Sequence, residues 1–437
     1  NQIFNTITLG ADSRETDCGK PHWRDAEITR ERRAAAAVLN DAFTEQEVWA
    51  AVKRMKNGKY GKSSGLERVP AECYKHARTV DSDGHVGRNV LIPALLVLAN
   101  HIRETGDFPE QFITFPLTPI HKKGDTRVHS NYRGLAVGGA LFKLYSSLLE
   151  RRLAKWLEDR KQRYLGQGGF REKCGTSDLL LLLRHLEHRY CRFRKDTALF
   201  VCQIDFEKAF DKVQWEVLWA RLELQGIHGS MLQALKQGYA RVLMRVRVNG
   251  RLGQSFEIKQ GVKQGDPLSV VLFGCFIEAL AEYLLAASGR GSNLRIPYID
   301  GVPLPCGLFA DDLSLFALNA DTMQLMLGLV EKYCIAFGMS INASKTEMLL
   351  FSGSGNVRRR PSSAPPAPSP FDPTFSGFTL QGGAVHVRLA PQAKYLGIVH
   401  GPGRLFIKCT DELLAAGRKA MYATMRDLRV QTLHTPS

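Results

Sequence analysis

Apolar residues recur at helical spacing in several long segments of the chain. Residues 44–56 carry apolar side chains at this spacing behind Thr44, and Glu47 follows three positions later, which is the pattern of a capping box at a helix start. Residues 141–157 place apolar and aromatic side chains on one face and predict an amphipathic helix. Further helices are predicted over residues 90–104, 177–191, 206–226, 266–287 and 322–338.

Shorter apolar runs between these helices predict strands. Residues 198–205 form an apolar run that ends in an acid, and a hairpin is predicted where two such runs flank Asn249-Gly250. Prolines in residues 115–121 push the residues before them out of the α region and predict extended chain. Another strand is predicted over residues 340–351. Because strands are mixed with helices, the sequence predicts an α+β fold.

The run GLFADDLSLFA, residues 307–317, places two acids inside an apolar strand. Burying an unpaired carboxylate is costly, and neighbouring side chains of a strand face opposite ways, so Asp311 and Asp312 can act together only where the chain turns. Asp205 ends a different strand, and three carboxylates at adjacent strand ends could hold two Mg²⁺ ions for phosphoryl or nucleotidyl transfer. The alternative is a surface hairpin with solvated acids.

The length and the charge of the chain limit the classes of partner that it can bind. The chain has 437 residues, enough for two or three domains, and its 44% hydrophobic content is typical of a globular protein. Its 59 Lys and Arg residues outnumber 43 Asp and Glu residues, which gives a formal charge of +16. This excess suits nucleic acid or, less well, an anionic membrane surface, and charge alone does not choose between them.

Cysteine usage and the apolar runs favour an intracellular protein without a membrane span. The nine cysteines are scattered without a C-x-x-C pair, so neither disulfides nor a zinc knuckle are expected. The longest apolar run, residues 269–287, is interrupted by Glu278 and Glu282. The first ten residues lack both a secretory signal and an initiator Met, so we expect a fragment of a longer protein.

Composition divides the chain into four parts. Residues 1–40 are polar with little periodicity and are interpreted as an N-terminal extension. Residues 352–383 begin with a Ser-, Gly- and Pro-rich stretch that cannot bury a core, and we interpret them as a linker or insertion. They separate a large part, residues 41–351, from a short one, residues 384–437.

Several sequence blocks together resemble, in order and approximate spacing, the blocks of reverse transcriptases, and most of all those of the non-LTR, LINE-type retrotransposon group. With upstream blocks such as PIHKKGDTRVHSNYRG and GFREKCGTSDLLLLL, the resemblance extends over roughly residues 44–400. The main blocks are IDFEKAFDKV (204–213), GVKQGDPLSVVLF (261–273), FADDLSLF (309–316), NASKTEM (342–348) and KYLG (394–397).

This resemblance implies a right-hand polymerase with fingers, palm and a partial thumb, in which an antiparallel palm sheet packs on helices. Residues 41–351 would form the fingers and palm, and residues 384–437 the primer-grip region and the start of the thumb. Only about 40 residues follow Tyr395, too few for a complete thumb, and an endonuclease domain and a cysteine–histidine zinc motif are missing from the sequence. We therefore expect a truncated or domesticated chain.

The resemblance also assigns catalytic roles. Asp205 matches the first catalytic aspartate of the palm, and Asp311 with Asp312 matches the acidic pair, so these residues are expected to bind two Mg²⁺ ions, with Mn²⁺ as a substitute. Lys345 lies in a block placed like the motif near the leaving group and would donate a proton to pyrophosphate. A surface lysine is the alternative for Lys345.

Two blocks are assigned to the incoming nucleotide. Phe210, with Ala209 before it in the same block, matches the bulky residue beneath the sugar, where a ring leaves no room for a ribose 2′-hydroxyl and favours dNTP over NTP. The alternative is that Phe210 belongs to the core. Gln264 and Gly265 match the block that lies against the nucleotide and the template, where glycine permits close backbone approach.

Basic residues are assigned to phosphates. Lys122 and Arg133 match residues that the family turns toward the triphosphate, although each has a solvated surface charge as its alternative. A basic loop and a later turn are assigned to the template phosphates and to the primer end: Lys56, Lys59 and Lys62, and Tyr395, Leu396 and Gly397.

Three functions follow from these observations. The first is an RNA-directed DNA polymerase that adds dNTPs to a DNA primer on an RNA template. The second is an RNA-binding protein that keeps the fold but has lost turnover, and the third is a maturase-like splicing helper. A LINE-like origin suggests a nuclear location, whereas the template, the target site and the oligomeric state cannot be read from the sequence.

Overall fold

The described residues form two compact units. The computed structural model describes residues 23–55, 66, 69–80, 82–83, 86–192, 198–289, 292–352, 377–396 and 398–400. Unit 1 comprises the described residues within Asn1–Phe170, Glu207–Tyr283 and Tyr333–Ser340. Unit 2 comprises those within Arg171–Phe206, Leu284–Lys332 and Ile341–Ser437. Most of the predicted linker and of the predicted thumb region lies outside the described residues.

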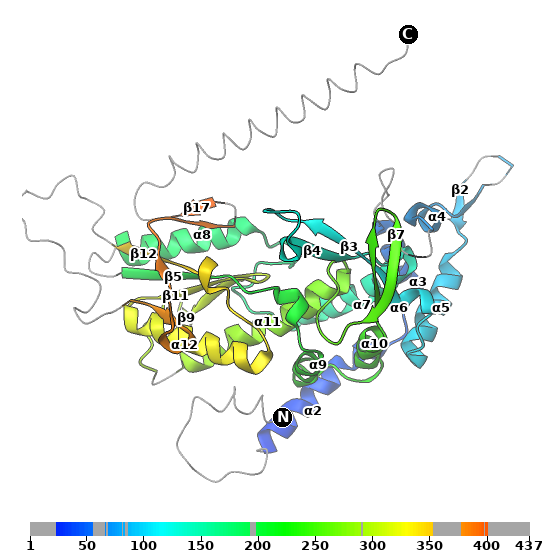
Figure 1. Ribbon diagram of the computed structural model, residues 1–437. Coiled ribbons are helices and arrows are strands. Elements are labelled where there is room, and N and C mark those ends of the chain that lie inside the picture. Colours follow the sequence, from blue (N-terminus) through cyan, green and yellow to red (C-terminus); the bar gives the residue numbers. More distant parts are fainter. Residues whose placement is uncertain are drawn as a thin grey trace, which may run out of the picture. The chain divides into compact units, whose positions relative to one another are not determined.

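Unit 1 combines a four-stranded sheet with helices (Figure 1). Its strands are β3 (Thr114–His121), β4 (Tyr132–Ala136), β6 (Leu243–Val248) and β7 (Arg251–Glu257), with a separate pair β1 (Arg78–Val80) and β2 (Val86–Asn89). Its helices are α2 (Trp23–Ala36), α3 (Glu45–Arg54), α4 (Ala71–Lys75), α5 (Ile92–Thr105), α6 (Glu110–Ile113), α7 (Ala140–Asp159), α9 (Trp215–Leu224), α10 (Gly229–Ala240) and most of α11 (Pro267–Ala287).

The sheet of unit 1 has the strand order β4-β3-β6-β7. Strand β3 pairs antiparallel with β4 and parallel with β6. Strands β6 and β7 form the predicted hairpin, and its turn residues Asn249 (φ 49°) and Gly250 (φ 77°) both adopt the left-handed conformation that Asn-Gly favours. The hairpin prediction is therefore confirmed.

Local signals also place the helices of unit 1. The Thr44 backbone N–H donates to Glu47 Oε2 at 2.9 Å, and the Glu47 N–H donates to Thr44 Oγ1 at 3.2 Å, so the predicted capping box opens α3. Helix α3 packs against α5 and α7, and the predicted helices over residues 90–104 and 141–157 are confirmed by these two elements.

Unit 2 is organised around a five-stranded sheet. Its strands are β5 (Ala198–Ile204), β10 (Cys306–Phe309), β11 (Asp312–Ala317), β12 (Glu347–Ser352) and β15 (Arg388–Leu389). Short pairs are β8 (Tyr298–Ile299) with β9 (Val302–Pro303), β13 (Thr379–Leu380) with β14 (Val385–His386), and β16 (Ala393–Tyr395) with β17 (Ile398–His400). Its helices are α8 (Thr176–Glu187) and most of α12 (Ala320–Phe337).

The order of this sheet is β10-β11-β5-β12-β15, so the central strand β5 lies between two strands that come much later in the sequence. The first four strands are antiparallel, and only β15 joins parallel to β12. Helix α8 covers one face and α12 lies across the other (Figure 1). On the α8 side, Leu183, Val201 and Phe316 belong to one buried apolar cluster. The prediction of a mixed α+β fold is confirmed.

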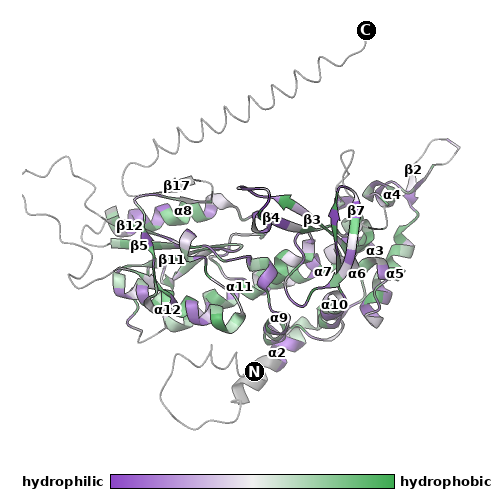
Figure 2. Cartoon of the chain, in the orientation of Figure 1, coloured by the Kyte–Doolittle hydropathy of each residue, from purple (hydrophilic) through white to green (hydrophobic). Residues whose placement is uncertain are grey.

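Helices such as α12 alternate hydrophilic and hydrophobic stretches, as expected when one side is buried (Figure 2).

Helix α11 differs from these helices. By length and composition it could cross a membrane, but 67% of its apolar stretch is buried inside the protein. Its Glu278 is 1% exposed and accepts from the Arg163 guanidinium at 2.7 Å and from the Tyr164 N–H at 3.0 Å. A paired acid in its interior is typical of a core helix.

Two sequence predictions of local structure are wrong in part. Residues 206–226 were expected to form one helix, but Lys208 is left-handed (φ 49°), Ala209–Lys212 make a 3₁₀ turn, and α9 begins only at Trp215. The carbonyls of this turn are taken by a distant loop, since the Val262 N–H donates to Phe210 O at 2.8 Å. Within residues 340–351, the strand β12 begins at Glu347, after a 3₁₀ turn.

Candidate active site

Asp311 and Asp312 lie at the tip of the β10–β11 hairpin. Phe309 pairs with Asp312, so Ala310 and Asp311 form the connection between the strands. Ala310 has a φ of 57°, a conformation that residues other than glycine adopt uncommonly, and it reverses the chain within two residues. The prediction that the acidic pair lies where the chain turns is confirmed.

Asp205 reaches the same edge of the unit 2 sheet. Strand β5 pairs antiparallel with β11, and Ile204 lies opposite Leu313. Asp205 is the first residue after β5. It therefore lies beside Asp312 at the ends of two adjacent strands. Three carboxylates thus gather where the sequence predicted, from segments more than a hundred positions apart.

The crowded carboxylates affect one another electrostatically. Partial burial, together with the negative charges of Asp311 and Asp205, raises the pKa of Asp312 to about 6, although its side chain still reaches solvent. Lys345 places its Nζ 3.1 Å from Asp205 Oδ2. The backbone supports this ion pair, because the Asn342 N–H donates to the Asp205 carbonyl at 2.7 Å just before the turn that carries Lys345.

The donor set suits a divalent cation such as Mg²⁺. Such ions prefer oxygen ligands and are usually bound by one or two carboxylates, completed by water and substrate phosphates. In the described part of the chain, no group of three or more His, Cys, Asp or Glu side chains is placed so that it could hold a metal ion by itself. Asp205, Asp311 and Asp312 offer the oxygen donors that such an ion prefers, and its remaining ligands would have to come from water or a substrate.

Tyr395 and Leu396 lie where a short strand ends and a turn begins, as predicted. Strand β16 ends at Tyr395, and Leu396 (φ 49°) begins the turn to β17. The Tyr395 ring is only 4% exposed and belongs to the apolar cluster beneath the sheet. Burial raises its pKa to about 12, with a smaller opposing effect of Ser314. The buried ring supports the turn, and the contact of this turn with a primer stays a prediction.

In unit 1, Phe210 is fixed between two other aromatic rings. It stacks on Phe273 of α11 with centroids 4.2 Å apart and planes 12° apart. Phe170 meets it edge-on, at 6.4 Å and 88°. Ala209 is buried, whereas Phe210 is half-buried, so one side of its ring remains accessible. No role was predicted for Phe170 or Phe273, although both lie inside blocks that resemble the family.

The loop with Gln264 and Gly265 is tied to strand β4. The Ala136 N–H donates to the Gln264 carbonyl at 3.0 Å. Gly265 has a φ of 103°, and a Cβ at this position would lie 2.9 Å from a Leu135 side-chain carbon and 3.2 Å from the Ala136 carbonyl oxygen. Glycine is therefore required here by both conformation and space, and the backbone that it approaches is β4.

Asp211 joins this region and was missed by the sequence analysis. The Gln264 Nε2 donates to Asp211 Oδ1 at 3.0 Å. Burial raises the pKa of Asp211, and the Gln264 hydrogen bond and the charges of Lys208, Lys122 and Arg133 oppose this effect. Two cations predicted to face the triphosphate therefore act on the same carboxylate.

Lys122 and Arg133 come from the β3–β4 pair. Arg133 lies on β4 opposite Ile120, and Lys122 follows the end of β3, where its N–H donates to the Asn131 carbonyl at 2.8 Å. Both side chains are exposed. The remaining predicted contacts lie outside the described residues: Lys56, Lys59, Lys62 and Gly397.

The start of α11 is stabilised by buried charges. Asp266 accepts hydrogen bonds from the Ser146 hydroxyl and, at 3.3 Å, from the Leu268 N–H. Burial lowers the pKa of Lys263 to about 8, and the negative charge of Asp266 opposes this effect. The Lys263 ammonium lies 4.1 Å from the Tyr239 ring centroid. These groups fix the loop that carries Gln264, and the prediction that Pro267 starts a helix is confirmed.

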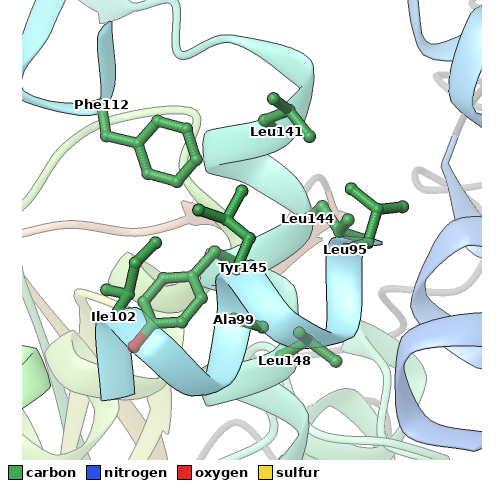
Figure 3. Close-up of a pocket in the computed structure, with 9 residues that line it drawn as sticks. Leu95, Ala99, Ile102, Phe112, Leu141, Leu144, Tyr145 and Leu148 are labelled. Carbon is green, nitrogen blue, oxygen red and sulfur yellow. The ribbon is translucent and has the colours of Figure 1, made fainter. Parts of the chain in front are cut away.

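Figure 3 shows an apolar cavity of unit 1 that is not a candidate substrate site. Residues of α5 and α7, such as Leu95, Ile102 and Leu148, line it together with Phe112. Its polar atom is the Tyr145 hydroxyl, which is buried without a hydrogen-bond partner among the described residues. A cavity with one polar group offers nothing to recognise a charged nucleotide.

Comparisons with known proteins agree with this geometry. Residues 120–400 match the family model described as "Reverse transcriptase (RNA-dependent DNA polymerase)". The chain is 31% identical over 58% of its length to the "Retrovirus-related Pol polyprotein from type-1 retrotransposable element R2" of Popillia japonica. It is 23% identical over 74% to the type-2 R2DM polyprotein of Drosophila melanogaster, and 27% identical over 75% to the "Transposon TX1 uncharacterized 149 kDa protein" of Xenopus laevis.

These relatives are much longer proteins. The matched regions cover 34%, 29% and 23% of their respective lengths, so the chain spans about a third or less of each. The family match itself contains the three acids, Phe210, Gln264 and Lys345.

Proposed function

The chain belongs to the reverse transcriptase (RNA-dependent DNA polymerase) family and is related to polyproteins of non-LTR retrotransposons, and we propose that it extends a DNA primer on an RNA template by adding dNTPs. On this proposal the five-stranded sheet of unit 2 is the palm, and β3 and β4 belong to the fingers. The observation that carries the proposal is the gathering of Asp205, Asp311 and Asp312 at adjacent strand ends within the matched region.

Asp205, Asp311 and Asp312 would hold two Mg²⁺ ions, or Mn²⁺ in their place. Bound there, such ions supply a clamp on the attacking and leaving oxygens of a nucleotidyl transfer. The chain itself keeps three carboxylates close together at one sheet edge. Burial and the negative charges of Asp311 and Asp205 raise the pKa of Asp312 to about 6, and a bound cation would offset those charges.

Lys345 would serve the leaving group. Its ammonium lies 3.1 Å from Asp205 Oδ2, so it is already held at the edge that carries the acids. From this position Lys345 would neutralise the pyrophosphate and give it a proton. Lys122 and Arg133 would stabilise the triphosphate before that step.

Phe210 would select the sugar. Its ring is braced by Phe273 and Phe170, so it cannot turn aside without disturbing two aromatic contacts. A ring held in this way excludes a 2′-hydroxyl by volume and offers it no hydrogen-bond partner. The proposal therefore includes a preference for dNTP over NTP.

Primer extension tests the proposed function. Purified protein is incubated with a DNA primer on an RNA template, labelled dNTPs and Mg²⁺, beside reactions with NTPs or with a chelator. We expect extension that requires both dNTPs and the divalent cation. Folded protein that binds RNA in a salt-sensitive way and extends no primer would contradict the proposal and favour an RNA-binding role.

A further inference from the structure

The sheet of unit 2 carries a polar layer between its apolar core and the three acids. Ser314 of β11 lies opposite Gln203 of β5, and Gln203 lies opposite Glu347 of β12. The next layer away from the acids is apolar and belongs to the buried cluster on the α8 side: Val201, Phe316 and Leu349. The change from apolar to polar side chains therefore takes place one layer before the acids.

Ser314 and Gln203 lie on the face of the sheet that leads to the acids. Side chains of a strand alternate between its two faces, so Asp312 and Ser314 lie on the same face of β11 as Phe316. Asp205 is the first residue after β5 and follows Gln203 by two positions. Ser314 and Gln203 are therefore the first pair of side chains behind Asp312 and Asp205.

Both side chains carry a buried polar atom that the fold leaves unused. Ser314 is 0% exposed, and neither its Oγ nor Gln203 Nε2 has a hydrogen-bond partner among the described residues. Leaving such a group unsatisfied costs about 1–3 kcal/mol, a cost that an apolar side chain would not carry. The pair therefore indicates a hydrogen-bonding role that packing alone does not require.

The Tyr395 hydroxyl lies in the same region. Burial raises the pKa of Tyr395 most, Ser314 lowers it, and the negative charge of Asp312 raises it. A hydroxyl that responds to both residues lies close to both. Ser314 and Asp312 therefore share one region beneath the edge of the sheet.

The spacing along β11 requires a bridge between Ser314 and Asp312. Residues two positions apart in a strand lie about 7 Å from each other, which is too far for a direct hydrogen bond between these short side chains. A buried water molecule spans such a gap and needs about two to four polar partners. The Ser314 hydroxyl and the Gln203 amide can donate to it or accept from it, and the Asp312 carboxylate accepts.

We propose that Ser314 and Gln203 are positioning residues that hold the Asp312 carboxylate for a divalent cation through hydrogen bonds relayed by a buried water molecule. This inference rests on the proposed polymerase function and deepens it, because it adds support behind the three acids. Hydrogen-bonding partners behind a metal-binding carboxylate fix its orientation. The polar layer would thereby keep Asp312 in place beside two acids that repel it.

Mn²⁺ binding tests the inference without catalysis. Free Mn²⁺ is measured by electron paramagnetic resonance while the full chain is titrated, and the site at the acids is defined as the binding that Asp311→Asn removes. We expect Ser314→Ala to weaken Mn²⁺ binding at this site about 10–100-fold, the usual effect of removing a partner behind a metal ligand. Gln203→Met, which keeps the length of the side chain without its amide, should weaken it as well.

Cys202→Ala is the matched control for a change in packing. Cys202 is 0% exposed, precedes Gln203 in β5 and lies opposite Leu315, on the other face of the sheet. Without metal, this control should lower the Tm, whereas Ser314→Ala should leave it nearly unchanged because an unsatisfied hydroxyl is removed. Unchanged Mn²⁺ binding in Ser314→Ala, or an equal loss in Cys202→Ala, would overturn the inference and leave Ser314 a packing residue.

The inference can fail separately from the proposed function. In primer extension, Ser314→Ala should raise the Mg²⁺ concentration at half-maximal rate by a similar factor and change the rate at saturating Mg²⁺ much less. If wild-type protein extends no primer but binds Mn²⁺ at the acids, weaker binding in Ser314→Ala still supports the positioning role. Wild-type protein from which Asp311→Asn removes no Mn²⁺ binding would overturn it.

Discussion

Carboxylates of the two units have opposite surroundings: one in unit 1 is buried beside a cation, and three in unit 2 lie beside one another. In unit 1, Glu278 is 1% exposed, and an internal guanidinium, that of Arg163, holds it at 2.7 Å. In unit 2, Asp312 lies beside two further acids, Asp205 and Asp311, whose charges help to raise its pKa to about 6. A carboxylate with an internal cation serves the fold, whereas carboxylates gathered together are suited to a cation from solution.

The largest effect should follow from removing one acid of unit 2. We expect Asp311→Asn to lower primer extension by roughly 10³-fold or more, because the three carboxylates act together and one of them is lost. RNA binding should be kept. The measurement is single-turnover extension beside RNA binding by filter assay. Asp321→Asn, an exposed acid in the first turn of α12, is the matched control. Extension retained in Asp311→Asn would contradict the proposal that the acids of unit 2 serve catalysis.

Removing the buried acid of unit 1 should lower the stability of the folded protein. Glu278→Gln leaves the Arg163 charge buried without its counter-charge, and we expect a loss of about 3–5 kcal/mol in the free energy of unfolding. Urea denaturation followed by circular dichroism measures it. Asp159→Asn, from the exposed pair with Lys155, should cost about 1 kcal/mol or less. If the two substitutions cost the same, the buried pair has no special role in the fold.

The next prediction concerns the preference for dNTP over NTP, which we assign to Phe210 in unit 1. We expect Phe210→Val to raise NTP incorporation relative to dNTP by about 10–100-fold, because the ring that fills the space of a 2′-hydroxyl is removed. Competition between UTP and dTTP in primer extension measures this ratio. Phe256→Val, at an exposed position of β7, provides the control. An unchanged ratio in Phe210→Val would assign Phe210 to the core alone.

The smallest effect should be a pH dependence of stability without metal. Since folding raises the pKa of Asp312 from 3.8 to about 6, its contribution favours the folded state below the unfolded value and is lost as the pH rises through the folded value. Asp312→Asn should therefore raise the Tm above pH ~6 in a chelator and leave it nearly unchanged below pH ~4. Thermal melts at several pH values measure it. A lower Tm of the variant at high pH would contradict the assigned repulsion.

Local sequence signals predicted those parts of the site that depend on neighbouring residues. The acids of the β10–β11 hairpin interrupt an apolar run, and such a run can carry Asp311 and Asp312 together only at a turn. The Asn249-Gly250 turn and the capping box at Thr44 are local in the same sense. Each could be predicted because a single short segment contains its physical cause.

Contacts between distant segments could not be predicted in this way. Phe170 packs on the edge of Phe210, and Asp211 bonds to Gln264, but the registers that bring these residues together are set by the whole fold. The burial of Tyr395 has the same origin, since its ring enters a cluster built from several strands and α8. A single sequence shows the residue types of such contacts but not their pairing.

The strand order of the unit 2 sheet has a consequence for synthesis on the ribosome. Strand β5 ends at Ile204, yet its two neighbours begin only at Asp312 and Glu347. At translation rates of about 5–20 residues per second, β5 waits roughly 5–20 seconds for β11 and longer for β12. During that interval an apolar strand with two unpaired edges has emerged without its partners, so slower elongation or scarce chaperones should lower the yield of folded protein more than its final stability.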